Sequence, residues 1–402
     1  MGLWLIMNKK IPSWILKIIS ISIGFTGSFI ILEIWARLLP ASDYFPSELP
    51  LICKNPIYPD KNCIFRRSPN KMGHFTKGEF PPFNISAKKR TNDLGQFSNI
   101  NFETIKVEDS NFKKVISIGD SFVEALQIPN EKTFHGRLNN YVTESGKYLI
   151  STSIGSSGNA LPQFLTHLFY LNKNIDLKST VVIFTIAVND FDESLEKFLI
   201  HKGAYFSNEN PLHIGFKERL PNNNIKLKRG LISSSALARY LFFNIRFDKK
   251  LNSVLCKANL KNCDKFKTLG SNLVYSEKEV QKERFIKTKI SSNVFLKYIS
   301  NLRNSKLEKK NTLFIIDTHR ENIYDINSKK DYYFDFQREY FMKEAKKMGF
   351  TVVDMDKIFR NHFKINKKRF EFINDGHWNS IAHKIITEEI ANILALKKIN
   401  EF

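Results

Sequence analysis

The chain has 402 residues and a formal net charge of +22 at pH 7, with 62 lysines and arginines against 40 aspartates and glutamates. Hydrophobic residues make up 42% of it, which is enough to bury a sizeable core and excludes global disorder. The charge alone would suit a nucleic-acid-binding protein. However, the lysines are scattered, and no zinc-finger spacing, RNA-recognition motif or basic heptad region is present. We therefore expect no nucleic-acid partner.

Two basic clusters, at residues 88–90 and 367–369, are predicted to lie in solvated loops. Their weak functional interpretation is attraction to an anionic membrane surface or an acidic polysaccharide. A biased genome composition would also raise the lysine content, so the charge by itself identifies no partner.

An apolar segment near the N-terminus predicts a membrane-spanning helix. Residues 11–32 are long enough to cross a hydrocarbon core of ~30 Å, and Lys17 within them lies near one end, where it can snorkel. Lys9 and Lys10 precede the segment, so the N-terminus should stay in the cytoplasm and the rest of the chain outside it. Residues 1–39 are thus interpreted as a cytoplasmic stub and signal anchor. A cleaved signal peptide and a buried core helix are the alternatives.

Four cysteines fit an exported protein. Cys53 and Cys63 enclose one short loop, and Cys256 and Cys263 enclose another. Two local disulfides are the preferred interpretation, with other pairings and unpaired thiols left open. Neither pair has the tight spacing of a structural zinc site, so no metal is expected.

The rest of the chain divides into a proline-rich lead-in and an alternating domain. Prolines interrupt residues 40–110, which are predicted to form an irregular stalk and lead-in. Apolar runs then alternate with amphipathic stretches over residues 111–397, which predicts a three-layer α/β/α domain around a parallel sheet. The predicted strands are 114–118, 147–150, 180–186, 312–316 and 351–355, and the predicted helices are 131–145, 160–172, 284–303 and 379–397.

A long connection separates the third and fourth predicted strands, at about residues 191–283. Such a length is uncommon unless the segment is functional or has its own structure. We interpret it as an inserted cap or lid beside the active-site end. The alternative is a segment that merely covers an edge of the sheet.

A serine stands directly after the first predicted strand. Residues 119–122 read Gly-Asp-Ser-Phe, and the glycine permits a sharp turn before Ser121. Ligands of open parallel sheets bind beyond the carboxyl ends of the strands, and Asn189 reaches the same edge after the third strand. Gly155 and Gly158 follow the second strand, where a backbone N–H can approach a ligand closely. In a sheet of order 2-1-3-4-5, the residues that follow the first three strands lie close together at one edge of the sheet.

A carboxylate and a histidine stand near the other end of the chain, in the sequence Asp-Gly-His-Trp. Together with Ser121, Asp375 and His377 are the three residue types that nucleophilic acyl transfer requires. His377 would accept and return the serine proton, while Asp375 would orient the imidazole.

Several neighbouring residues have a structural interpretation as well as a functional one. Asp120 and Asp190 are expected to brace loops or cap helices rather than react. Trp378 is expected to pack beside the histidine, with the acyl pocket as its alternative location. His319 follows the fourth strand and is a weaker candidate for lining the cleft.

These blocks resemble the SGNH, or GDSL-type, hydrolase superfamily over residues 110–395. Residues 119–122 match its first block, Gly158 its second and residues 187–190 its third. Asp375 and His377 match the last block, and the lead-in at residues 91–95 resembles that of membrane-anchored members.

The resemblance implies a flavodoxin-like fold with sheet order 2-1-3-4-5, no cofactor and a catalytic triad of Ser121, Asp375 and His377. It also implies an oxyanion hole formed by the backbone N–H groups of Ser121 and Gly158 and the side-chain amide of Asn189. Loss of one such donor usually costs about 10²–10³ in rate.

Two positions depart from the family pattern. Ala187 replaces the usual glycine of the third block, and the aspartate stands two residues before the histidine instead of three, where Asn374 is found. An Asp-x-His-Trp block resembles proteins of alginate and peptidoglycan O-acetylation, which favours acetyl groups on sugars.

The sequence therefore predicts a membrane-anchored serine esterase that acts on O-acyl or O-acetyl groups of a carbohydrate. The alternatives are an O-acetyltransferase of an envelope or exopolysaccharide and a catalytically silent glycan- or partner-binding module. The expected partners are an acylated small molecule or polysaccharide, the cytoplasmic membrane through the N-terminal helix, and a membrane acyl-donor protein. The catalytic domain is expected on the periplasmic or cell-envelope side.

Overall fold

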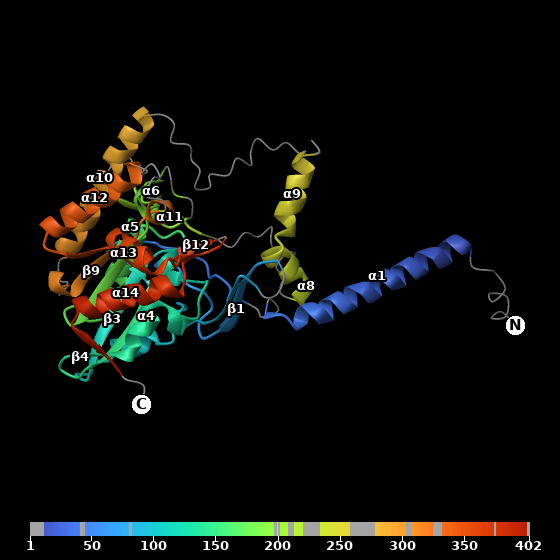
Figure 1. Cartoon of the computed structure of the whole chain (residues 1–402), viewed down its shortest axis with the longest axis horizontal. Coiled ribbons are helices and arrows are strands. Elements are labelled where there is room, and N and C mark those ends of the chain that lie inside the picture. The colour runs from blue at the N-terminus through green and yellow to red at the C-terminus, as the bar shows by residue number, and fades with distance from the viewer. Residues whose placement is uncertain are drawn as a thin grey trace. The chain divides into compact units, whose positions relative to one another are not determined.

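The structure is a computed structural model, and its elements are drawn in Figure 1. By contact the chain divides into two compact units. The smaller comprises Met1–Tyr44, Thr76–Phe83 and Asn223–Asn262, and the larger Phe45–Phe75, Asn84–Asn222 and Cys263–Phe402. The described residues are 12–40, 45–79, 83–196, 199, 202–207, 213–219, 234–257, 278–302, 307–324, 332–373 and 375–399.

A mostly parallel sheet forms the centre of the larger unit, with seven strands in the part of the chain that the structure describes. Numbered along the chain, the parallel strands have the spatial order 2-1-3-4-5, which is the order predicted from the sequence. Two short antiparallel strands, β4 (Tyr141–Thr143) and β13 (Leu396–Lys398), extend the sheet at one edge. In spatial order, the parallel strands are β5 (Tyr148–Gly155), β3 (Phe112–Gly119), β6 (Thr180–Ile186), β9 (Thr312–Ile316) and β10 (Thr351–Asp354).

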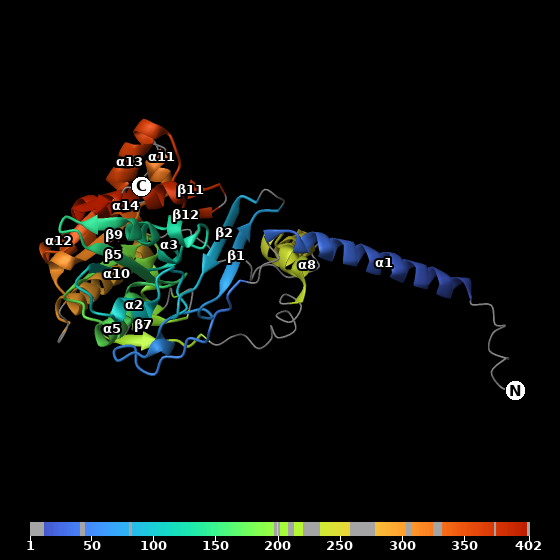
Figure 2. The ribbon, with the colours of Figure 1, turned by 90° about the horizontal axis from the view of Figure 1, so that it is seen from below.

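Helices cover both faces of the sheet because the central strands are apolar on both. Successive side chains of a strand point to opposite faces, and every residue of β6 is buried. Phe184 belongs to the hydrophobic core on one face, and Ile183 to the core on the other. Figure 2 shows α13 and α14 on the opposite side of the strands from α5 and α10. The first core contains residues of α5 (Leu161–Asn174), α10 (Lys278–Ser300) and α12 (Tyr332–Lys347), and the second contains residues of α4 (Phe134–Arg137), α13 (Met355–Asn366) and α14 (Ser380–Ile393).

The single helix predicted at residues 131–145 is wrong. Two 3₁₀ turns, Asn130–Lys132 and Leu138–Asn140, flank α4, and the chain then enters β4. The Thr133 hydroxyl accepts from the Gly136 N–H and starts a new turn there. The segment 142–143 then pairs with neighbouring strands, which suits its β-branched side chains.

Most of the lead-in that was predicted as an irregular stalk belongs to the larger unit and contains regular structure. Residues 45–75 and 84–110 contain β2 (Ile85–Arg90), α2 (Phe102–Lys106) and most of β1 (Met72–Lys77). Their buried side chains pack in the same core as α5, namely Ile64, Leu94, Phe102 and Ile105. The prolines interrupt regular structure locally but do not prevent the apolar residues between them from packing.

The solvated loop predicted at residues 88–90 is wrong, because Lys89 lies in β2. Its side chain is buried, and its ammonium group donates to the carbonyls of Ala125 at 2.9 Å and Ile128 at 3.0 Å. Its neighbours Lys88 and Arg90 are exposed, as the alternation of a strand requires.

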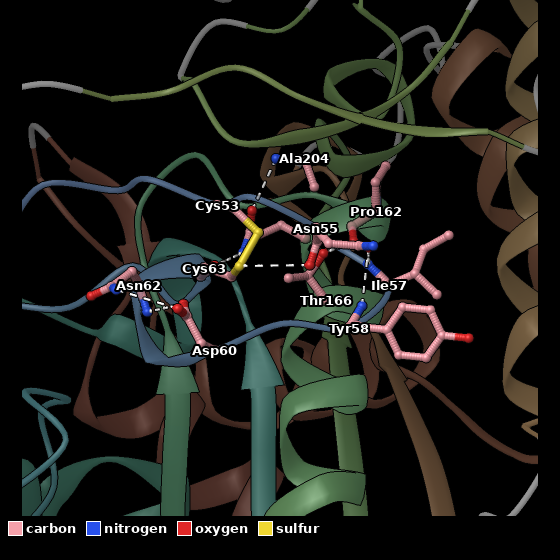
Figure 3. Close-up of a disulfide and its surroundings, with 11 residues drawn as sticks. Cys53, Asn55, Ile57, Tyr58, Asp60, Asn62, Cys63, Pro162, Thr166 and Ala204 are labelled. Atoms are coloured by element: carbon pink, nitrogen blue, oxygen red, sulfur yellow. Dashed lines mark hydrogen bonds between the residues drawn. A yellow bond between two sulfur atoms is a disulfide. The ribbon is translucent and has the colours of Figure 1, made fainter.

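A disulfide joins Cys53 to Cys63, one of the two local pairings preferred from sequence (Figure 3). The loop is tied to α5 through Gln163, whose Nε2 donates to the Cys63 carbonyl at 2.9 Å. The Gln163 Oε1 in turn accepts from the N–H of Ala204 at 3.0 Å. Cys263 and the side chain of Cys256 lie outside the described residues.

The smaller unit contains α1 (Ser13–Arg37), which is long and apolar enough to cross a membrane. The Glu33 carboxylate accepts the backbone N–H groups of Ala236 and Leu237, both at 3.0 Å. These are the first two residues of α8 (Ala236–Arg239). A π-helical turn at Tyr240–Asn244 and helix α9 (Phe247–Lys257) follow.

The long connection expected at residues 191–283 divides between the two units. Its first part, with β7 (Ala204–Phe206) and β8 (Ile214–Phe216), belongs to the larger unit. Its second part carries α8 and α9 in the smaller unit. Residues 220–233 and 258–277 lie outside the described residues, and the lid role stays a prediction.

Candidate active site

Ser121 stands at the carboxyl end of β3, where the chain turns sharply into α3 (Ser121–Glu124). The Asp120 carboxylate accepts from the N–H of Phe122 at 2.9 Å and so caps this short helix. A Cβ at Gly119 would clash with the side chain of Val123. Glycine is therefore required for the close approach of β3 and α3.

His377 and Asp375 form a hydrogen-bonded pair on β12 (Asp375–Trp378). His377 Nδ1 lies 2.5 Å from Asp375 Oδ1, and the backbone N–H of His377 donates to the same oxygen at 3.1 Å. The Gln127 amide approaches the carboxylate at 3.4 Å. The Asp375 side chain is 8% exposed and that of His377 is 31% exposed, so the acid is enclosed while the imidazole can meet a substrate.

Phe122 connects this pair to the serine. Its ring centroid lies 5.1 Å from that of His377 and 4.9 Å from that of Trp378. Because Phe122 follows Ser121 directly, these contacts hold the histidine next to the serine turn. The Arg320 guanidinium stands 5.7 Å from the centroid of the same ring.

Asp317 anchors the histidine segment to the end of β9. Its carboxylate accepts from Trp378 Nε1 at 3.0 Å and receives two hydrogen bonds from Arg320, at 2.8 Å and 3.0 Å. Trp378 is buried and packs in the second core, as expected. Asp317 and Arg320 were not among the site residues predicted from the sequence. The only available signal was their position directly after the fourth predicted strand.

The Ser121 hydroxyl is hydrogen-bonded to Asp120 rather than to His377. Its Oγ donates to Asp120 Oδ2 at 3.2 Å, and no hydrogen bond joins it to the imidazole in the described part of the chain. A change of serine rotamer redirects this oxygen without moving the backbone. Catalytic hydrogen bonds in ligand-free sites are often loose and tighten around the substrate.

Gly158 and Asn189 stand at the same edge of the sheet, after β5 and β6. Gly158 adopts a φ of 81°, in the left-handed region that favours glycine. The Asn189 side chain is exposed and hydrogen-bonds to the Glu193 carboxylate. Each residue is positioned by the strand that precedes it, beside the strand that carries Ser121.

The Gly158 loop is held by a buried ion pair. Glu124 Oε2 accepts from the N–H of Ser157 at 2.9 Å and from its hydroxyl at 2.6 Å. Arg67 from the lead-in donates to Glu124 Oε1 at 2.9 Å and 3.1 Å. Burial raises the pKa of Glu124, but the Arg67 charge and the Ser157 hydrogen bonds outweigh it and lower that pKa overall.

Asp120, Asp190 and Glu193 are buried carboxyl groups whose charges affect one another's pKa. Burial raises the pKa of Asp120 to about 6, against the hydrogen bond from Phe122 and the charge of His377. Burial also raises the pKa of Glu193 to about 7. Burial, and then the charge of Asp120, hold the pKa of Asp190 well above its ordinary value. The cluster therefore retains protons at pH values where isolated carboxyl groups have lost them.

Asp190 and His319 have structural contacts. Asp190 Oδ2 accepts from the N–H of Ala187 at 2.7 Å and braces the turn after β6. The His319 ring stacks on Phe334, with centroids 6.1 Å apart. Its cleft-lining role stays a prediction.

Among the described residues, no group of three or more histidine, cysteine, aspartate and glutamate side chains is arranged to hold a metal ion.

No family model and no curated protein matches the chain. Among solved structures, it is similar to the acetyl xylan esterase AlAXEase, with 13% identity, a TM-score of 0.37 and coverage of 69% of this chain and 98% of that one. It is also similar to the acetylxylan esterase Axe2 from Geobacillus stearothermophilus, with 9% identity, a TM-score of 0.38 and coverage of 72% and 97%. A third is LAE5, an alpha/beta hydrolase from the metagenome of Lake Arreo, Spain, with 12% identity, a TM-score of 0.37 and coverage of 72% and 97%. At these TM-scores the likeness carries no argument about function.

Proposed function

We propose that the larger unit is an SGNH-type serine esterase that removes O-acyl groups, acetyl groups in particular, from a carbohydrate. The observation that carries the proposal is the His377–Asp375 pair, with Nδ1 and Oδ1 2.5 Å apart, packed through Phe122 beside the serine turn. A serine, a histidine and an orienting carboxylate at one edge of a parallel sheet are the components of nucleophilic acyl transfer.

In the proposed reaction, Ser121 Oγ turns from Asp120 toward His377 and attacks the ester carbonyl carbon. The serine proton passes to His377 Nε2, and Asp375 stabilises the imidazolium through Nδ1. Collapse of the tetrahedral intermediate breaks the ester C–O bond, and the leaving alkoxide takes the proton from Nε2. Water then attacks the acyl-serine with the same histidine as base, which releases the carboxylic acid and restores Ser121.

The negative oxygen of each tetrahedral intermediate would be stabilised by the backbone N–H groups of Ser121 and Gly158 and by the Asn189 amide. The left-handed backbone at Gly158 and the adjacent strands β5, β3 and β6 support this assignment. The hydrogen bond from Asn189 to Glu193 uses one direction of an amide that has two N–H donors.

The O-acetyl preference and the location rest on sequence. The Asp-x-His-Trp block resembles polysaccharide O-acetylation proteins, and α1 has the length and hydropathy of a membrane anchor. We place the catalytic unit outside the cytoplasm because lysines precede α1. The same acyl-serine would serve an O-acetyltransferase if a sugar hydroxyl replaced water as acceptor.

A hydrolysis assay with the full chain in detergent tests the proposal. The wild type should release acetate from 4-nitrophenyl acetate and from an acetylated oligosaccharide, and Ser121→Ala should release none above background. Ser110→Ala is the matched control and should keep full activity, because Ser110 lies in the turn before β3. Acetate release by Ser121→Ala at the wild-type rate would contradict the proposal. Acetyl transfer to an added oligosaccharide, without free acetate, would identify the transferase.

A further inference from the structure

A cavity of about 610 Å³ lies in the larger unit between α5, α10 and the disulfide loop, defined as residues 53–63. Its volume falls within the roughly 300–1,000 Å³ of typical ligand pockets. Its lining is more apolar than polar. Tyr58, Phe169 and Tyr298 supply rings, Asn172 and Asn301 supply amides, and Lys173 and Lys297 supply the charges.

The cavity lies away from the serine. Its α5 residues belong to the C-terminal half of that helix, whereas the helix begins at Leu161, just after Gly158. At 1.5 Å per residue, the helix separates Asn172 from its own first turn by roughly 16 Å. The cavity is therefore outside the site around Ser121.

The loop that forms one wall is fixed at several points. The disulfide closes its base, and Asn55 Oδ1 accepts from the N–H groups of Ile57 at 2.9 Å and Tyr58 at 3.2 Å. Figure 3 shows these contacts, with the Tyr58 ring directed away from the disulfide. The residue is 79% exposed, so its ring adds little to the core and can contact a ligand.

The charged side chains that line the cavity are all positive among the described residues. Lys173 and Lys297 line it, and its lining includes no carboxylate among the described residues. Neither ammonium group forms an ion pair in the part of the chain that the structure describes. An anionic ligand could therefore form ion pairs with these two ammonium groups.

We propose that this cavity binds an acidic oligosaccharide, as a second subsite for the polymer on which the esterase acts. A pyranose ring has a face of C–H groups that packs on an aromatic ring, and hydroxyl groups that hydrogen-bond to amides. A uronic acid carboxylate would pair with Lys173 or Lys297. The identity of the ligand rests on the proposed function, whereas the binding itself does not require Ser121.

Isothermal titration of the full chain in detergent with tetragalacturonate tests the inference. The Ser121→Ala variant should bind as tightly as the wild type. Tyr58→Ala and Lys297→Gln should each weaken binding by about five- to tenfold, because each removes one contact. Lys178→Gln removes an exposed lysine outside the cavity and should leave binding unchanged. Unchanged thermal midpoints would exclude misfolding of these variants.

Neutral maltotetraose, adenosine monophosphate and anionic phosphatidylglycerol vesicles complete the comparison. Each should bind at least tenfold more weakly than tetragalacturonate. Equal or tighter binding of one of them, lost in Lys297→Gln, would replace the oligosaccharide with that ligand class. Absence of tetragalacturonate binding, or binding that neither variant weakens, would overturn the inference. The serine chemistry is measured separately, so neither result decides the other.

Discussion

Asp375 Oδ1 lies 2.5 Å from His377 Nδ1 although one residue separates the two in the chain. Both residues belong to β12, and residues i and i+2 of a strand share one face. The exposed Gly376 lies between them. The two-residue spacing, which departs from the three-residue spacing of the family that the chain resembles, therefore brings acid and base together without a helical turn.

Asp375→Asn should lower kcat by about 10³–10⁴-fold, because an amide cannot hold the imidazole in the required tautomer or stabilise its charge. Hydrolysis of 4-nitrophenyl acetate measures the effect, and circular dichroism should show an unchanged fold. Asp109→Asn, in the exposed turn before β3, is the matched control. A decrease in kcat of less than tenfold would show that Asp375 is not a catalytic residue.

Trp378→Phe should lower kcat by about tenfold with little change in KM. The substitution removes the hydrogen bond to Asp317 at 3.0 Å, which anchors the segment that carries His377. Asp317 keeps its pair with Arg320, so no charge is stranded. A loss of about 1–3 kcal/mol in stability is expected alongside. An effect on stability with kcat unchanged would give Trp378 a packing role only.

Arg67→Met should destabilise the protein by about 3–5 kcal/mol, because it leaves Glu124 buried without its cation. Denaturant unfolding of the full chain measures this. The folded-state pKa of Glu124 is depressed, so the stability it contributes is present above its unfolded pKa and lost as the pH falls through the folded pKa. The variant should thus differ least from wild type in acid.

Glu48→Gln is the control for that prediction. Glu48 also approaches Arg67, at 3.5 Å, but its side chain is 41% exposed. Solvent screening limits such a pair to about 1 kcal/mol or less. A Glu48→Gln effect as large as that of Arg67→Met would contradict the assignment of the stability to Glu124.

Between about pH 4.5 and pH 7, the free energy of unfolding should fall less in the Glu193→Gln variant than in the wild type. Burial raises the folded-state pKa of Glu193 from 4.5 to about 7, so the folded protein holds a proton there that the unfolded chain has lost. Stability from this group is complete below the unfolded pKa and falls as the pH rises through the folded pKa, by up to about 3 kcal/mol. The thermal midpoint against pH reports it, and a slope identical to wild type would disprove the raised pKa.

The strands, and the position of Ser121 at the end of one of them, could be predicted because their sequence signals are local. Val181 to Phe184 form an apolar run long enough for a buried strand, and Ser121 directly follows such a run. The contacts of Asp317 with Trp378 and of Arg67 with Glu124 could not be predicted, because they join segments that are distant in sequence. No periodicity reports a contact between two such segments.

The lead-in was mispredicted for a related reason. Its prolines indicate breaks in regular structure, but burial of Phe102 and Ile105 depends on a core supplied by α5. Lys89 gives the clearest example, since a lysine within a basic cluster is usually solvated and this one is buried against three backbone carbonyl groups.

Covalent labelling of Ser121 would show whether this residue is an activated nucleophile. The full chain in detergent is treated with a fluorophosphonate, digested and analysed by mass spectrometry. We expect one phosphonylated peptide, modified at Ser121, with labelling lost in Ser121→Ala and slowed by about 10³-fold or more in His377→Ala. A folded protein that stays unlabelled at Ser121, or that is labelled equally fast without His377, would contradict this expectation.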